Sequence, residues 1–172
     1  DPHFWFDPLR VKKAVWDISA RLSVLDPSGA ETYRSNAESY NARLDELHAW
    51  TVEAVGRIPE ERRLLASSHD SMGYFANEYG FKVLGAILST ATEAEPSADD
   101  IAQLSLKIEE YGVPAVFVET TINDRLAAAV ASESGAKIVS LHTESLGSED
   151  SGAETYIEMI RNNVTRIVEA LE

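Results

Sequence analysis

The chain has 172 residues and a formal net charge of −14, with 15 Lys and Arg against 29 Asp and Glu. This acidic balance argues against a nucleic acid or an anionic membrane surface as the main partner, because clustered Lys and Arg bind both. The chain has no cysteine, which excludes disulfides, thiolate zinc sites, iron–sulfur clusters and a cysteine nucleophile. Its apolar runs are far shorter than the ~20 residues needed to span a bilayer, so we expect no transmembrane span.

The start of the chain is unusual. Asp1 and His3 flank a proline, and three aromatic residues follow at positions 4–6. Chain termini are usually polar and loosely held. We therefore expect this start to be a cut rather than a natural end, with a native N-terminus that packs as the alternative.

Two helices are expected first. Asp7 as N-cap, Pro8 at the first helical position and apolar residues at helical spacing predict a helix over residues 7–25. The turn-forming residues at 26–29 end it. A second helix is predicted over about residues 30–57, which at 1.5 Å per residue is roughly 40 Å long. A helix of that length either packs in a bundle or bridges two lobes.

After residue 62 the pattern changes to short apolar runs that alternate with helical stretches. Strands are expected over residues 64–68, 81–88, 114–118 and 137–141. Helices are expected over residues 70–79, 97–112, 123–135 and 153–171. Such alternation predicts an α/β fold with a parallel four-stranded sheet and helices on both faces.

Candidate ligands lie where these strands end, since open α/β sheets bind ligands beyond the carboxyl ends of their strands. The candidates are His69, Glu119, His142 and Glu144. Imidazole and carboxylate without thiolate are ligands for Zn²⁺ or Mn²⁺. His142 and Glu144 alternate, so they share a side if the strand stays regular, but the chain turns there and either one could point inward. A hydrogen-bonded turn residue is the commoner role of a histidine at a strand end.

The other two histidines differ in context. His3 lies in a segment held by Pro8, and the pattern alone leaves a functional and a structural role equally open. His48 lies mid-helix beside Asp45 and Glu46, and we interpret it as solvated surface.

Several segments together resemble the metal-specific solute-binding proteins of zinc and manganese ABC importers, sometimes called cluster A-I, a family that includes manganese-binding lipoprotein adhesins. Residues 1–8 resemble its Asp-Pro-His-x-Trp-Leu-Asp-Pro motif, and residues 68–75 resemble its His-Asp-x-x-x-Tyr-Phe segment. Residues 95–97 and 116–119 match a further family stretch, and residues 142–146 resemble the segment with the last ligand. The resemblance covers essentially the whole chain, but only the C-terminal half of the family's length.

The resemblance implies a fold of two (β/α)₄ lobes that are joined by one long helix and hold the metal between them. On this basis we expect residues 1–29 to be a remnant of the N-terminal lobe, made of a ligand motif and a helix. Residues 30–62 would form the long interdomain helix, and residues 63–172 the C-terminal α/β metal-binding lobe.

The resemblance also implies three metal ligands in this chain: His3, His69 and Glu144. Glu144 stands where the family more commonly has Asp, which alters the reach of the carboxylate. The family's remaining ligand is a His of the N-terminal lobe, which has no counterpart here. Two imidazoles and one carboxylate favour Zn²⁺ over Mn²⁺ as the transported ligand.

Three further residues are expected to support the site rather than to bind metal. Glu119 matches a characteristic Glu of the family that is not usually a ligand. Arg125 is a candidate partner for a carboxylate near the site. His142 follows the last strand, two residues before a proposed ligand.

The expected function is therefore that of an extracytoplasmic solute-binding subunit of an ABC importer, not an enzyme. It would capture a divalent metal ion between lobes and deliver it to a membrane permease, in the periplasm or lipid-anchored at the outer face of the cell membrane. A zinc-dependent hydrolase is one alternative, because three ligands plus water form the catalytic zinc pattern. An adhesin or interaction fragment without metal transport, and a plain α/β domain, are the others.

Overall fold

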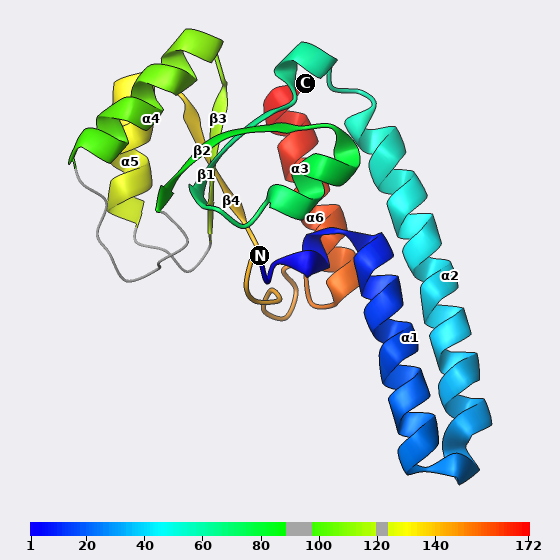
Figure 1. Ribbon diagram of the computed structural model, residues 1–172. Helices are drawn as coiled ribbons and strands as arrows, with labels where there is room; N and C mark the ends of the chain where they lie inside the picture. The colour runs from blue at the N-terminus through cyan, green and yellow to red at the C-terminus, as the bar shows by residue number, and fades with distance from the viewer. Residues whose placement is uncertain (89–97, 120–123) are drawn as a thin grey trace.

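The molecule consists of a helical hairpin that projects from an α/β lobe (Figure 1). The computed structural model describes residues 1–88, 98–119 and 124–172. The hairpin is formed by α1 (Pro8–Leu25) and α2 (Ala30–Val55), as predicted. Short 3₁₀ helices lie at its ends, over Phe4–Phe6, Pro27–Gly29 and Glu60–Arg62.

The lobe contains a four-stranded parallel sheet, which confirms the predicted fold class. Its strands are β1 (Leu64–His69), β2 (Lys82–Leu88), β3 (Ala115–Glu119) and β4 (Lys137–Leu141). They lie in the order β2-β1-β3-β4, with β3 and β4 in register from Ala115↔Lys137 to Glu119↔Leu141. All four strands therefore end at one edge of the lobe.

Four helices connect and cover the strands. They are α3 (Gly73–Tyr79), α4 (Ala98–Tyr111), α5 (Asp124–Ser134) and α6 (Tyr156–Leu171). Two of them begin later than predicted, α3 at residue 73 rather than 70 and α6 at residue 156 rather than 153. In α6 the reason is a capping box, in which Thr155 and Glu158 satisfy each other's backbone N–H groups.

The two faces of the sheet bury separate cores. Phe117 and Leu141 point to the face that is covered by α2, α3 and α6, whereas Val116 and Val118 point to the face covered by α4 and α5 (Figure 1). This alternation follows from the two-residue period of a strand, and it explains why β3 is buried along its whole length.

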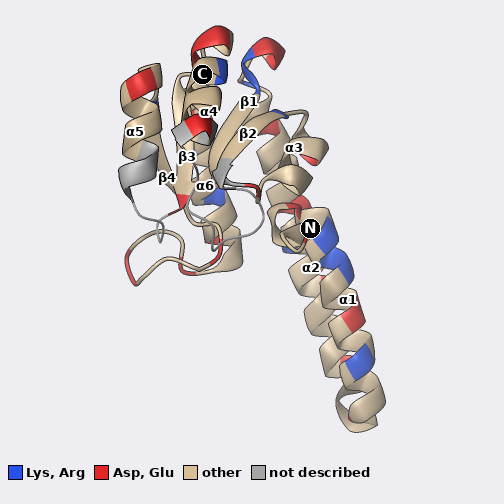
Figure 2. Cartoon of the chain, turned by 60° about the vertical axis from the view of Figure 1, so that its left-hand side comes forward, with Lys and Arg blue, Asp and Glu red and all other residues tan. Residues whose placement is uncertain are grey.

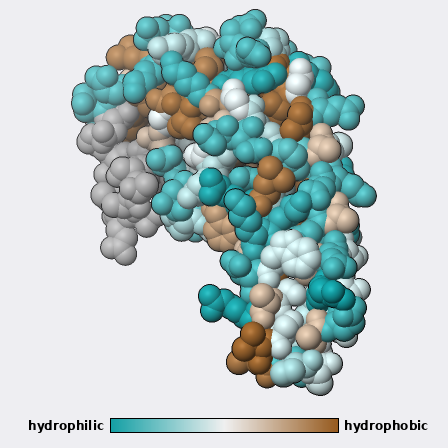
Figure 3. Space-filling model, turned by 45° about the vertical axis from the view of Figure 1, so that its right-hand side comes forward, coloured by the Kyte–Doolittle hydropathy of each residue, from teal (hydrophilic) through white to brown (hydrophobic). Residues whose placement is uncertain are grey.

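The hairpin is anchored at one end and exposed at the other. Leu44 and Leu47 of α2 are fully buried in the first core, together with Phe6. At the far end of α1, Val24 and Leu25 are about four-fifths exposed. Hydrophobic atoms lie on the surface at the tip of the hairpin (Figure 3). Even so, within the described ranges no helix combines the length and apolar character needed to cross a bilayer.

Candidate metal-binding site

The first residues of the chain lie near the carboxyl edge of the sheet because the start of α1, which follows them, is anchored to the lobe. Asp7 caps α1, with its Oδ1 accepting a hydrogen bond from the Leu9 N–H at 2.9 Å. The short 3₁₀ helix before Asp7 buries the Phe6 ring in the core. This anchoring brings His3, which is itself buried, to the loop that follows β4.

The imidazole of His3 has a fixed orientation. Its Nδ1 lies 2.7 Å from Oδ1 of Asp1, and the His3 backbone N–H donates to the same oxygen at 2.9 Å. An ionised carboxylate only accepts hydrogen bonds, so this contact places the ring proton on Nδ1. Nε2 then carries the lone pair, which is the tautomer found for histidines that bind metals through Nε2.

Nε2 of His3 faces the carboxylate of Glu144, with 3.5 Å between Nε2 and Oε1. That separation is longer than an ordinary N–H···O hydrogen bond of about 2.7–3.2 Å. Two ligands bound at about 2.1 Å to one tetrahedral ion lie about 3.4 Å apart. The pair is therefore spaced as two ligands of one metal ion would be, and it joins the start of the chain to the loop that follows β4.

Trp5 connects the His3 segment to the Glu144 loop. Its ring meets the His3 ring edge-on, with 5.3 Å between ring centroids. Its indole Nε1–H donates to the carbonyl oxygen of Thr143 at 2.8 Å, across 138 residues of sequence. The Trp5 carbonyl in turn accepts a hydrogen bond from the Tyr156 hydroxyl at 2.7 Å, so α6 supports this contact.

His142 does not share a strand with Glu144. Strand β4 ends at Leu141 as predicted, so the condition for alternation, a strand that stays regular through both residues, is not met. The ring of His142 is half-buried, and desolvation together with the nearby Arg166 guanidinium lowers the pKa of His142. Its backbone is bound by Asn163 of α6.

The other predicted residues are only partly described. Glu119 is buried at the end of β3, where its backbone N–H donates to Oγ of Ser68 at 3.2 Å. The backbone of His69 ends β1 at the same edge, and Arg125 lies in α5. The side chains of His69 and Arg125 fall outside the described part of the structure. Among the described side chains, no three His, Asp or Glu groups surround a common point.

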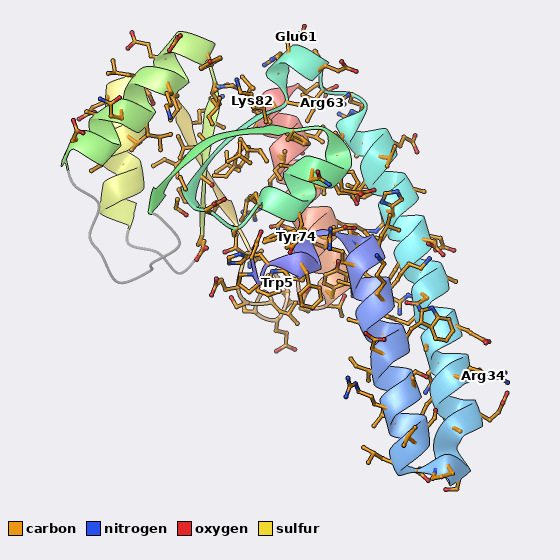
Figure 4. All side chains as sticks on the ribbon, in the orientation of Figure 1. Trp5, Arg34, Glu61, Arg63, Tyr74 and Lys82 are labelled. Atoms are coloured by element: carbon orange, nitrogen blue, oxygen red, sulfur yellow. The ribbon has the colours of Figure 1, made fainter. Side chains whose placement is uncertain are left out.

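Sequence reasoning missed the residues that hold the two facing side chains. Tyr74, shown with Trp5 in Figure 4, donates from its hydroxyl to the Asp1 carbonyl at 3.2 Å. The Arg10 guanidinium lies 4.2 Å from the Tyr74 ring centroid. A carboxylate two residues before a histidine was the one local signal for Asp1, whereas the roles of Trp5 and Tyr74 depend on the tertiary fold.

The charge distribution suits a cation. Acidic residues occur on the helices and on the loop after β4 (Figure 2). That loop carries Glu144 with Glu149, Asp150 and Glu154, and the chain as a whole has a net charge of −14. Backbone N–H groups around Glu154 lower the pKa of its carboxyl group. A surface of this kind attracts cations and repels anions.

Known proteins resemble this chain along nearly its full length. A family model described as the periplasmic zinc-uptake complex component A, ZnuA, matches residues 1–170. The chain is 40% identical over 172 residues to the manganese-binding lipoprotein MntA of Halalkalibacterium halodurans. This alignment covers 99% of the chain and 57% of that protein. It is 31% identical over 177 residues to the zinc-binding protein TroA of Treponema pallidum, with 99% and 57% covered.

The fold agrees with a solved structure. The periplasmic zinc-binding protein TroA from Treponema pallidum matches with a TM-score of 0.92 and 29% identity, covering 99% of this chain and 64% of that chain. The chain thus spans little more than half the length of these relatives.

Proposed function

Because the chain belongs to the family of the periplasmic zinc-uptake complex component A, we propose that it is the C-terminal part of the substrate-binding protein of a metal ABC importer. Its cargo is a divalent transition metal ion, with Zn²⁺ favoured over Mn²⁺ because imidazole is a preferred zinc ligand. It works outside the cytoplasm and hands the ion to a membrane permease. It binds and releases the ion and performs no chemistry on it.

The observation that carries this proposal is the 3.5 Å approach of His3 Nε2 to Glu144 Oε1, with Asp1 holding the opposite ring nitrogen. We assign both side chains as ligands of the ion. His69, whose strand ends at the same edge, is the third proposed ligand. A carboxylate that fixes the ring proton of a liganding histidine also raises its basicity toward metal.

The division of the chain follows the same proposal. Residues 1–29 belong to an N-terminal lobe, residues 30–62 form the interdomain helix, and residues 63–172 form the C-terminal lobe. The exposed apolar residues at the far end of α1, Val24 and Leu25 among them, support this division. Apolar side chains exposed to this extent are expected to pack against another part of the protein.

In the proposed capture of the metal ion, His3 and Glu144 have different roles. The buried imidazole presents a lone pair, and the more exposed Glu144 carboxylate supplies negative charge at the rim. An ion that enters between the lobes exchanges its water for these fixed groups. Closure of the lobes then strengthens the attraction by excluding water, and opening at the permease reverses it.

The first test is the pH dependence of binding. Lowering the pH from about 7.5 to about 5 is expected to weaken Zn²⁺ binding by more than tenfold, because protons compete with the metal for imidazole and carboxylate groups. Calorimetric titration at both pH values measures this. A His48→Ala variant should show the same pH dependence, because His48 lies on α2 away from Glu144 and contacts Tyr79. Equal affinity at the two pH values would contradict an imidazole–carboxylate site.

A further inference from the structure

The backbone that directly follows β4 is held by a side chain. Among the described residues, the ladder between β3 and β4 runs to Glu119↔Leu141, and His142 is the next residue along the chain. Asn163 of α6 binds both backbone groups of His142. Its Oδ1 accepts from the His142 N–H at 2.9 Å, and its Nδ2–H donates to the His142 carbonyl at 2.7 Å.

The paired hydrogen bonds between Asn163 and the His142 backbone require a side-chain amide. Only a group with one donor and one acceptor side by side satisfies both backbone groups of His142. Asn163 is 2% exposed, and a buried polar side chain at this depth is costly unless it is paired. Its two hydrogen bonds thus fix the position of the backbone at His142, where the loop that contains Glu144 begins.

The backbone of the next residue, Thr143, is held by a contact that does not involve Asn163. The Thr143 carbonyl accepts the Trp5 indole N–H at 2.8 Å, and the Trp5 carbonyl accepts the Tyr156 hydroxyl at 2.7 Å. Tyr156 and Asn163 lie about two helical turns apart and so on one face of α6. One helix face thereby holds both segments whose side chains meet, the one with His3 and the one with Glu144.

We propose that Asn163 is a positioning residue for the metal site, and that its amide clamp on His142 sets the reach of the Glu144 carboxylate toward His3. This inference rests on the proposed function. Because the backbones of residues 142 and 143 are both held, the backbone that enters Glu144 has a set position and direction. The ion then meets a carboxylate whose main chain is already ordered, which lowers the entropy cost of binding.

The test compares Asn163→Leu with Val164→Ala in the protein at its full natural length. Leu has the branched shape of Asn but cannot hydrogen-bond to His142, whereas Val164 is a buried neighbour on α6 whose apolar side chain makes no hydrogen bond. We expect Asn163→Leu to weaken Zn²⁺ binding about tenfold, the range found when a group that orients a ligand is lost. It should also change the visible spectrum of bound Co²⁺ and speed hydrogen exchange at the His142 amide.

The control separates positioning from stability. Val164→Ala should lower the melting temperature yet keep the Zn²⁺ affinity and the Co²⁺ spectrum. If Asn163→Leu does not fold, Asn163→Asp decides, since it keeps the side-chain size but loses the N–H that is donated to the His142 carbonyl, and it should shift both readouts in the same direction.

Two outcomes overturn the proposal in distinguishable ways. A folded Asn163→Leu protein with wild-type affinity and an unchanged Co²⁺ spectrum would leave Asn163 with a structural role alone. A wild-type protein that binds neither Zn²⁺ nor Co²⁺ would contradict the proposed function and the positioning role together, while amide exchange at His142 would still report whether the clamp forms.

Discussion

Replacing His3 with alanine is expected to lower the affinity for Zn²⁺ by about 100-fold or more. The loss of a group that merely orients a ligand costs 10- to 100-fold, so the loss of a ligand itself should lie at or beyond the upper end. His3 combines burial, a ring proton fixed by Asp1, and an Nε2 atom that faces Glu144. Calorimetric titration of the protein at its full natural length measures the change.

The matched control is His48→Ala. His48 is half-buried rather than solvated as the sequence suggested, with its Nδ1 3.2 Å from the Tyr79 hydroxyl. Its removal should perturb the fold about as much as removal of His3 does but leave the Zn²⁺ affinity unchanged. A His3→Ala protein that melts normally and binds Zn²⁺ like the wild type would remove His3 from the site.

The second large effect is a loss of stability, and it concerns the buried contact between the hairpin and the lobe. Leu47→Ala should lower the free energy of unfolding by about 2–5 kcal/mol, the usual range for emptying a fully buried leucine site. Leu47 is 0% exposed and packs in the core that α2 shares with α3, α6 and Phe6. Chemical denaturation followed by circular dichroism gives the value.

Leu106→Ala provides the comparison. It is the same substitution in a helix, but Leu106 of α4 is 58% exposed, so the change should stay within about 0.5 kcal/mol. Equal decreases in the free energy of unfolding for the two variants would mean that α2 does not pack against the lobe as described. The angle at which the hairpin leaves the lobe would then not be set by this core.

The fold was predictable where local patterns decide it. The Asp7 cap with Pro8 located the start of α1, and alternating apolar runs and helices identified the parallel sheet. The later start of α6 was missed because the Thr155–Glu158 capping box went unrecognised. The strand order is decided by long-range packing, which local periodicity does not report.

The site was predictable only as single residues. His3 and Glu144 stood out by type and by resemblance, but their 3.5 Å approach joins residues that lie far apart in the sequence. Asn163 carried no local signal, because an asparagine inside a helix usually faces solvent. Its role appears only when α6 lies beside the end of β4. Which of His142 and Glu144 points inward was left open by the sequence, because the chain turns after the strand that ends at Leu141, as predicted.

The support that α6 gives to both proposed ligand segments has a consequence for the order of events in synthesis. The helix that holds the two segments is the last element of the 172 residues, and one of the segments is the first. The His3 segment is therefore synthesised well before α6, and the proposed pair of His3 and Glu144 gains this support only after α6 has docked. Contacts of such long sequence separation form late and slowly. Formation of the proposed metal site is thus coupled to the docking of α6.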